Sequence, residues 1–156
     1  MSAVQPVPDG YRSVTPYLTI SGAADAIEFY KESFGATERS RMTAPNGRIG
    51  HAELEIGDSV IMLADEFPDM GGVSPTTVGG TPVIIHLYVD DVDSVVERAV
   101  AAGATLTTPV ANQFYGDRSG MLRDPYGHEW YVATHVEDVP PAEMERRAAE
   151  AMSGAA

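Results

Sequence analysis

Two stretches of the chain place apolar residues along one face of a helix. In the first, the apolar positions are Ala23, Ile27, Tyr30 and Phe34. In the second, they are Val92, Val95, Val96, Ala99 and Val100. Ser21 is a candidate N-cap of the first helix, and Gly35 is a candidate left-handed stop. Asp90 and Asp91 precede the second helix, and Gly103 is expected to end it.

Strand patterns follow each helix and also precede it. After the first helix come "ATERSRMT", "IGHAELEIG" and "DSVIMLADE", with hairpin turns at Asn46-Gly47 and Gly57-Asp58. After the second come "ATLTTPV", "QFYGDRSGMLRD" and "HEWYVATH", with an Asp-Pro-Tyr-Gly turn before the last. Each half therefore reads strand, helix and three strands. We predict an α+β fold in which two βαβββ repeats pair their sheets around a shared concave cavity.

The repeat predicts five segments along the chain. Residues 1–12 form a flexible N-terminal arm, 13–66 the first βαβββ module, 67–81 a connecting loop or lid, 82–135 the second module, and 136–156 a C-terminal tail or helix. As a lid, the connection would cover a ligand with Phe67 and Met70. The C-terminal segment carries a thin apolar stripe of Met144, Ala148 and Met152. This stripe either docks on the body or a partner subunit, or belongs to a frayed end.

Composition narrows the functional classes. The 156 residues are 44% hydrophobic, which is enough for a core, and there is no cysteine to form disulfides or thiolate sites. A net charge of −13 argues against nucleic-acid binding. This charge either attracts cationic ligands or serves solubility, and we favour solubility. No apolar run reaches membrane-spanning length and no secretory signal is visible, so we expect a cytoplasmic protein without membrane contact.

Strand alternation brings acidic and imidazole side chains to one face. In "IGHAELEIG" the apolar residues Ala52, Leu54 and Ile56 should face the helix, which turns His51 and Glu53 toward the concave side. By the same alternation His86 and Tyr88 share the inward face. Glu129, Tyr131 and Ala133 share one face of the last strand, opposite Trp130 and Val132. We expect His128 and His135 to face away from this set as surface or capping residues.

The segments "AADAIEFYKESFGA", "YVDDVDSVVERAVAAGAT" and "RDPYGHEWYVATH" resemble the vicinal-oxygen-chelate superfamily of glyoxalases, bleomycin-resistance proteins and extradiol dioxygenases. The stretches "VTPYLTISGAADAIEFYKESFGA", "GRIGHAELEIGDSVIMLADE" and "QFYGDRSGMLRDPYGHEWYVATH" are similar to its PhnB-like branch. The resemblance covers about Ser13 to His135. It implies the glyoxalase/bleomycin-resistance fold, but it does not fix an activity, because this scaffold carries many chemistries.

Metal-using members of that superfamily place His and Glu ligands at four inward strand positions. Carried over, these positions fall on Thr15, Met62, Ile84 and Tyr131. Since a thioether and an aliphatic side chain replace two ligands, we expect neither the usual divalent-metal site nor ordinary glyoxalase I activity, and no other cofactor. The alternative is a displaced metal site built from His51, Glu53, His86 and Glu129.

Three functional hypotheses remain open: a small-molecule binder, an enzyme, and a domain whose role is association. In the first, the protein binds a small molecule in the concavity, as a resistance or sequestration module, through Tyr17, Met62, Tyr88, Tyr115, Arg118 and Tyr131. Arg118 would then hold a carboxylate, unless it pairs with Asp117 or a neighbouring glutamate. In the second, the protein is a lyase, isomerase or dioxygenase-like enzyme that uses His51, His86 and Glu53, with or without a displaced metal. The resemblance also implies a homodimer.

Overall fold

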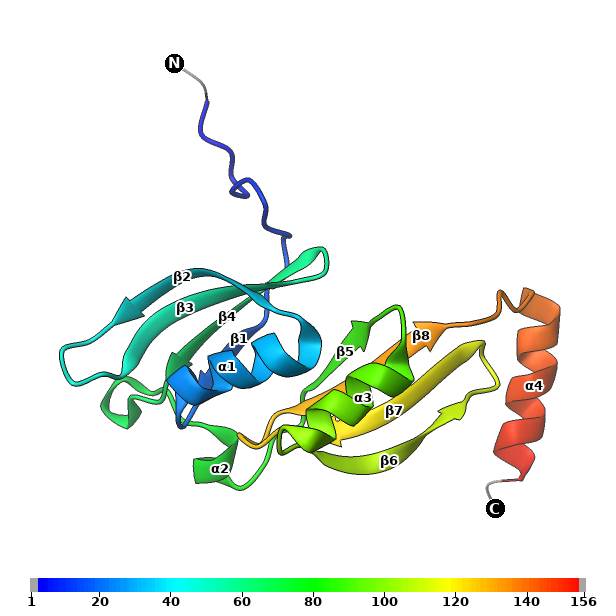
Figure 1. The fold of residues 1–156 in the computed structure, drawn as a ribbon. Helices are drawn as coiled ribbons and strands as arrows, with labels where there is room; N and C mark the ends of the chain where they lie inside the picture. The colour runs from blue at the N-terminus through cyan, green and yellow to red at the C-terminus, as the bar shows by residue number, and fades with distance from the viewer. Residues whose placement is uncertain (1–2, 155–156) are drawn as a thin grey trace. The chain divides into compact units, whose positions relative to one another are not determined.

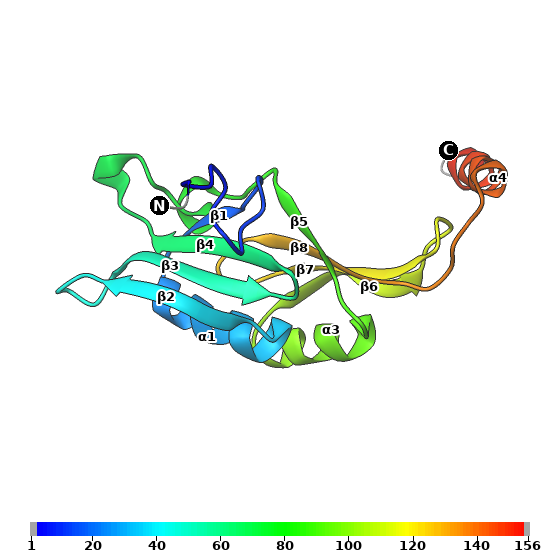
Figure 2. The same cartoon turned by 90° about the horizontal axis from the view of Figure 1, so that it is seen from above.

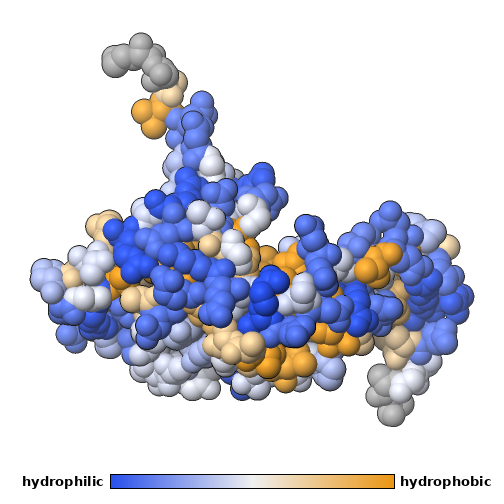
Figure 3. All heavy atoms as spheres, in the orientation of Figure 1, coloured by the Kyte–Doolittle hydropathy of each residue, from blue (hydrophilic) through white to orange (hydrophobic). Residues whose placement is uncertain are grey.

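A computed structural model describes residues 3–154 of the chain as two compact units. Unit one runs to Pro82 and also includes Pro125–His128, and unit two comprises Val83–Asp124 and the residues from Glu129 onward. In the described residues, no helix is long and apolar enough to cross a membrane. Polar residues cover much of the face drawn in Figure 3.

Unit one is a βαβββ module followed by two short helical turns (Figure 1). Its elements are β1 (Tyr17–Ile20), α1 (Ala23–Phe34), β2 (Thr37–Thr43), β3 (Ile49–Ile56), β4 (Ser59–Asp65), the 3-10 turn η1 (Pro68–Met70) and α2 (Pro75–Val78). The sheet order is β1-β4-β3-β2, with β1 and β4 parallel and the other pairs antiparallel.

Unit two repeats this topology and adds a C-terminal helix. Its elements are β5 (Ile84–Tyr88), α3 (Val92–Ala101), β6 (Thr105–Asn112), β7 (Asp117–Arg123), β8 (Glu129–His135) and α4 (Pro141–Ser153). The sheet order is β5-β8-β7-β6, again with one parallel pair, β5 and β8. The predicted pair of βαβββ repeats in an α+β fold is thereby confirmed, while a cavity shared by the two sheets stays a prediction.

In each unit the core lies between one helix and one face of the sheet. Figure 2 shows α1 on one side of its sheet and the N-terminal segment on the other. Ala52, Leu54 and Ile56 of β3 are buried, as are Trp130 and Val132 of β8. The intervening residues of both strands belong to the opposite, open face. The alternation predicted for β3 and β8 is therefore confirmed.

The helix ends agree with the sequence except at one cap. Gly35 ends α1 with a left-handed φ of 69°, and the Asp91 side chain accepts a hydrogen bond from the Ser94 amide at the start of α3. α3 itself ends at Ala101, shortly before Gly103. The prediction that Ser21 caps α1 is wrong, because the N-cap is Gly22 and no side chain of the segment caps it. Instead Asp65 of β4 accepts from the amides of Gly22 (3.1 Å) and Ala23 (2.9 Å).

The connecting loop is anchored by Glu66, the residue that precedes it. The Glu66 carboxylate accepts from the Ser74 amide (2.8 Å) and the Thr77 hydroxyl (2.7 Å). These bonds hold the pKa of Glu66 below its ordinary value, the Ser74 amide contributing most. The Arg48 guanidinium lies 4.5 Å from the Phe67 ring centroid. The connection is thus built around Glu66 and Phe67.

Candidate functional site

The open face of the first sheet brings together side chains from three neighbouring strands. Tyr17 of β1 is paired with Met62 of β4, and Met62 is paired with Glu53 of β3. His51 precedes Glu53 by two residues and shares its face. Tyr17, Met62, His51 and Glu53 were predicted to line a site, and the strand register brings these four together within unit one.

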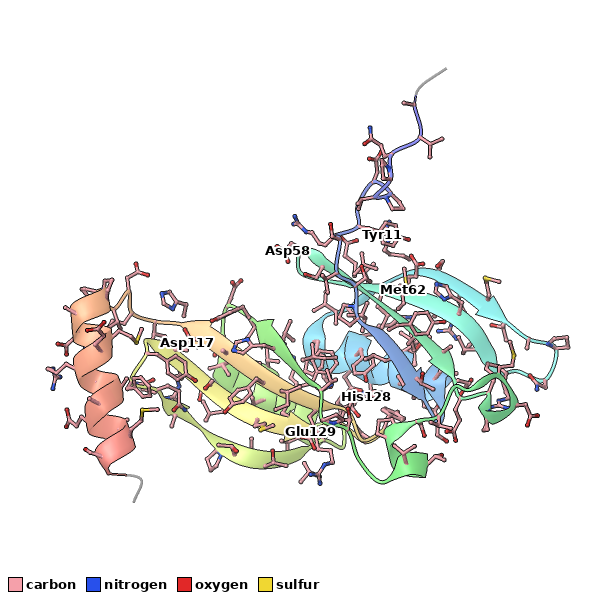
Figure 4. All side chains as sticks on the ribbon, turned by 180° about the vertical axis from the view of Figure 1, so that it is seen from behind. Tyr11, Asp58, Met62, Asp117, His128 and Glu129 are labelled. Carbon is pink, nitrogen blue, oxygen red and sulfur yellow. The ribbon has the colours of Figure 1, made fainter. Side chains whose placement is uncertain are left out.

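A chain of hydrogen bonds links four side chains on this face. Tyr17 Oη lies 3.1 Å from His51 Nδ1, and His51 Nε2 lies 2.9 Å from Glu53 Oε2. The second carboxylate oxygen, Glu53 Oε1, accepts a hydrogen bond from the hydroxyl of Tyr11. Tyr11 belongs to the predicted N-terminal arm, and Figure 4 shows it where that segment meets the sheet. Sequence reasoning missed Tyr11, because no local pattern joins residues so far apart in the chain.

The ionisation of Glu53 fixes the direction of these hydrogen bonds. The Tyr11 hydroxyl, and then His51, hold the pKa of Glu53 below its ordinary value, so the group is a carboxylate near neutral pH and only accepts. His51 Nε2 must therefore carry the hydrogen that it donates to Glu53. In the neutral imidazole Nδ1 is then an acceptor, and it receives the hydrogen of the Tyr17 hydroxyl.

A pocket of about 260 Å³ lies beside β1 in unit one. Its lining comes from β1, from the connection and from the turn before β8, and comprises Tyr17, Thr19, Val73, Pro75, Val78, Gly80, Thr81, Pro82 and His128. None of these nine residues is Asp, Glu, Lys or Arg. His128 Nε2 lies 3.0 Å from the Thr19 carbonyl oxygen, which joins the turn to β1. The predicted lid residues Phe67 and Met70 do not line this pocket.

The open face of the second sheet carries a different cluster. The His86 ring stacks on Tyr131 at 5.7 Å between centroids, and it lies 4.7 Å from the Tyr88 ring. The Tyr88 hydroxyl donates to the buried Asp117 carboxylate (2.8 Å), and this bond raises the pKa of Tyr88. His86, Tyr88 and Tyr131, all predicted site residues, are thus gathered within unit two.

Asp117 also binds His135, a residue predicted to face away. His135 Nδ1 lies 2.8 Å from Asp117, and its Nε2 lies 2.7 Å from Asp138. The bond with Asp117, and then that with Asp138, raise the pKa of His135. The predicted orientation is wrong for His135, since it alternates in phase with Tyr131 and Ala133 on the open face. A groove of about 480 Å³ lies beside it, lined by Tyr88, Val89, Asp90, Thr134 and His135.

Three predicted site residues of unit two have other partners. Arg118 lies on the α3 side of the sheet, where its guanidinium binds both carboxylate oxygens of Asp93 at 2.7 and 2.9 Å. This bond raises the pKa of Arg118 and lowers that of Asp93. Glu129 accepts from Arg123 at 2.9 Å, and Tyr115 packs edge-on against Phe114. Arg118 therefore forms an ion pair, but with Asp93 of α3 and not with Asp117 or a neighbouring glutamate as the alternative predicted.

Comparison with known proteins identifies the family of this fold. Residues 14–132 match the Glyoxalase/Bleomycin resistance protein/Dioxygenase superfamily. The chain belongs to this superfamily. The uncharacterized protein Mb0911c of Mycobacterium bovis is 43% identical over 136 residues, which are 85% of this chain and 90% of that protein.

Solved structures of other proteins share the fold. The gene product At5g48480 of Arabidopsis thaliana matches with a TM-score of 0.64 at 27% identity, over 79% of this chain and 98% of that one. A putative 3-demethylubiquinone-9 3-methyltransferase, PhnB protein, from Bacillus cereus matches with a TM-score of 0.60 at 18% identity, over 79% and 99% of the two chains. The PhnB likeness at this identity concerns the fold alone.

The four residues predicted to occupy the superfamily's metal positions are not ligands that a divalent ion prefers. Thr15 precedes β1, Met62 lies on β4, Ile84 begins β5 and Tyr131 lies on β8. None of the four offers a carboxylate or an imidazole. Across residues 3–154, no group of three or more His, Asp or Glu side chains is placed to hold a metal. The alternative set is divided between the units, His51 and Glu53 in unit one and His86 and Glu129 in unit two, and it stays a prediction.

Proposed function

We propose that the protein binds an uncharged small molecule on the open face of its first sheet, in the pocket beside β1, without the metal used by its glyoxalase relatives. The observation that carries this proposal is the lining of that pocket. The lining combines apolar residues of the connection with tyrosine, threonine and histidine, and it contains no Asp, Glu, Lys or Arg. Tyr17 is 52% exposed there, so its ring is available to a ligand.

The biological role that we propose is sequestration or resistance. A binder of this kind removes a harmful compound by holding it, and it needs neither a metal nor a bond-breaking step. From the superfamily resemblance we also propose that the protein acts as a homodimer in the cytoplasm. A sedimentation mass equal to one chain at micromolar concentration would contradict the dimer.

Ligand screening with two matched variants tests the binding site. A panel of uncharged and charged aromatic compounds is screened by saturation-transfer NMR. Val78, which is 61% exposed on α2, lines the pocket, whereas Met70, 85% exposed on η1, does not. We expect Val78→Arg to weaken an uncharged ligand at least about tenfold, because it places a charge in the pocket, and Met70→Arg to have no effect. If no compound binds, or if Val78→Arg binds as well as wild type, the proposed site is wrong.

The second candidate function is proton transfer by a lyase or isomerase. The specific observation in its favour is the 2.9 Å contact between His51 and the ionised Glu53, which resembles a base held by an orienting carboxylate. This function requires a bound compound to be converted. Mass spectrometry after incubation would show a product that His51→Asn no longer forms.

Metal analysis of protein purified without chelator tests the displaced metal site of His51, Glu53, His86 and Glu129. A stoichiometric ion that is lost in His51→Ala or His86→Ala would support that site.

A further inference from the structure

The hydroxyl of Tyr17 is the outermost member of the chain of hydrogen bonds on the first sheet. We propose that Tyr17 is the specificity-determining residue of the pocket beside β1, and that it selects uncharged small molecules carrying a hydroxyl or N–H group that donates to Tyr17 Oη. This inference rests on the proposed function, because it names the class of ligand that the same pocket takes.

The direction of these hydrogen bonds leaves the Tyr17 oxygen free to accept one more hydrogen bond. Glu53 accepts from His51 Nε2, so an imidazole that carries its one hydrogen on Nε2 accepts the Tyr17 hydrogen at Nδ1. The phenol has a single hydrogen. It is donated to His51 Nδ1, which lies 3.1 Å from Tyr17 Oη. The remaining lone pair of Tyr17 Oη thus favours a ligand that donates, and a ligand that only accepts would have to break the bond to His51.

The N-terminal segment holds this direction in place. The Tyr11 hydroxyl donates to the other oxygen of Glu53, so the carboxylate is fixed from both sides. Tyr11 is itself held, since the Arg39 guanidinium lies 4.7 Å from its ring centroid and donates to the Gly10 carbonyl oxygen at 3.2 Å. This arrangement makes a rotation of Glu53 costly, and the polarity of Tyr17 is thereby set by residues that do not line the pocket.

Solvent exposure decreases along the series of hydrogen-bonded side chains, from Tyr17 to His51 to Glu53. Tyr17 is 52% exposed, whereas the side chains of His51 and Glu53 are 26% and 12% exposed. Tyr17 is also the member of the chain that lines the pocket. A ligand in the pocket therefore meets the tyrosine, and His51 and Glu53 act through it as positioning residues.

A matched pair of probes tests the inference. Benzyl alcohol carries a hydroxyl donor, whereas benzyl methyl ether has the same ring and an oxygen that only accepts. Their dissociation constants are measured by equilibrium dialysis against wild type, Tyr17→Phe and Glu53→Gln, after circular dichroism has shown that each variant is folded. We expect wild type to prefer the alcohol about tenfold, the effect of one hydrogen bond. Tyr17→Phe should remove this preference while the ether binds as before.

The Glu53→Gln variant separates positioning from simple packing. Because Tyr11 donates to the amide oxygen of Gln, the amide NH₂ is turned toward His51 and donates to its Nε2. The imidazole hydrogen would then lie on Nδ1 and be donated to Tyr17 Oη, which would free the Tyr17 hydrogen for a ligand. The preference for the alcohol should then fall or invert, although Tyr17 is intact. Equal binding of both probes to wild type, an unchanged preference in Glu53→Gln, or no retention of either probe would each overturn the inference. The Val78→Arg screen judges the binding function separately, since it uses other ligands and another residue.

Discussion

The two units share one backbone plan but carry different chemistry on their open faces. In unit one Met62 is paired with Tyr17 and Glu53, and in unit two Tyr131 is paired with His86 and Met121. Met121 thus takes the place of Glu53. By the same register Ser119 takes the place of His51, and its buried hydroxyl has no partner among the described side chains. The repeat preserves strand pairing, whereas the polar network of unit one depends on residues that unit two lacks.

The helix caps show the same contrast between a shared position and a different residue. Asp65 at the end of β4 accepts from Ala23 at the start of α1, and Thr134 of β8 accepts from Val92 at the start of α3 (2.9 Å). Asp65 also binds the amides of Gly22 and Ile49, the latter at 2.6 Å. Thr134 instead donates to the Val89 carbonyl (2.8 Å). The carboxylate satisfies three amides and the hydroxyl one, so the two caps should differ in strength.

Removing the two caps should produce the largest effect and test this contrast directly. Asp65→Ala leaves three amides without their acceptor and should lower the free energy of unfolding by about 3 kcal/mol. Thr134→Val should cost about 1 kcal/mol. Urea denaturation gives the totals, and hydrogen exchange should show α1 loosened in one variant and α3 in the other. A smaller loss in Asp65→Ala than in Thr134→Val would contradict the account, and Asp65→Asn should be intermediate.

The pH dependence of stability that His135 causes should be a smaller effect than the loss of the caps. It tests the contrast between His135 of the second sheet and His51 of the first. Asp117 and Asp138 raise the pKa of His135 above its ordinary value of about 6.5, whereas His51 lies between a tyrosine and a carboxylate. A raised pKa in the folded state means that the stabilisation is fully present below about pH 6.5. It is lost as the pH rises through the higher folded-state pKa. The stability difference between wild type and His135→Gln should therefore be larger at pH 5.5 than at pH 8.5.

The NMR titration of His135 supplies the control for that prediction. Asp138→Asn removes one carboxylate at an exposed position and should lower the pKa of His135, while Asp117 keeps it above the ordinary value. Asp58→Asn, at an exposed position of unit one, should leave the titration unchanged. A wild-type midpoint at or below that of free histidine would show that the two carboxylates do not hold the imidazolium.

The sequence predicted those features that depend on local periodicity. The stripe of Ala23, Ile27, Tyr30 and Phe34 defines α1, and the alternation around Ala52 and Leu54 placed His51 and Glu53 on the open face. The cap of α1 and the bond from Tyr11 to Glu53 could not be predicted, because each joins residues about forty positions apart. In "DRSGMLR" polar residues occupy both faces of β7, so alternation gave no side for Arg118.

Replacing Arg118 should have the smallest effect on stability and on ligand binding. It tests whether the helix side of the second sheet takes part in binding. The Arg118 guanidinium binds Asp93 of α3 at a partly exposed position, where solvent screens the ion pair and keeps its contribution small. Arg118→Met should therefore change the free energy of unfolding by less than Thr134→Val does. It should also leave the affinity for anionic and uncharged ligands of the panel within about twofold, since the guanidinium lies on the helix side. Loss of binding of a carboxylate ligand in Arg118→Met would instead restore Arg118 to the binding site and require that it leave Asp93 when the ligand is bound.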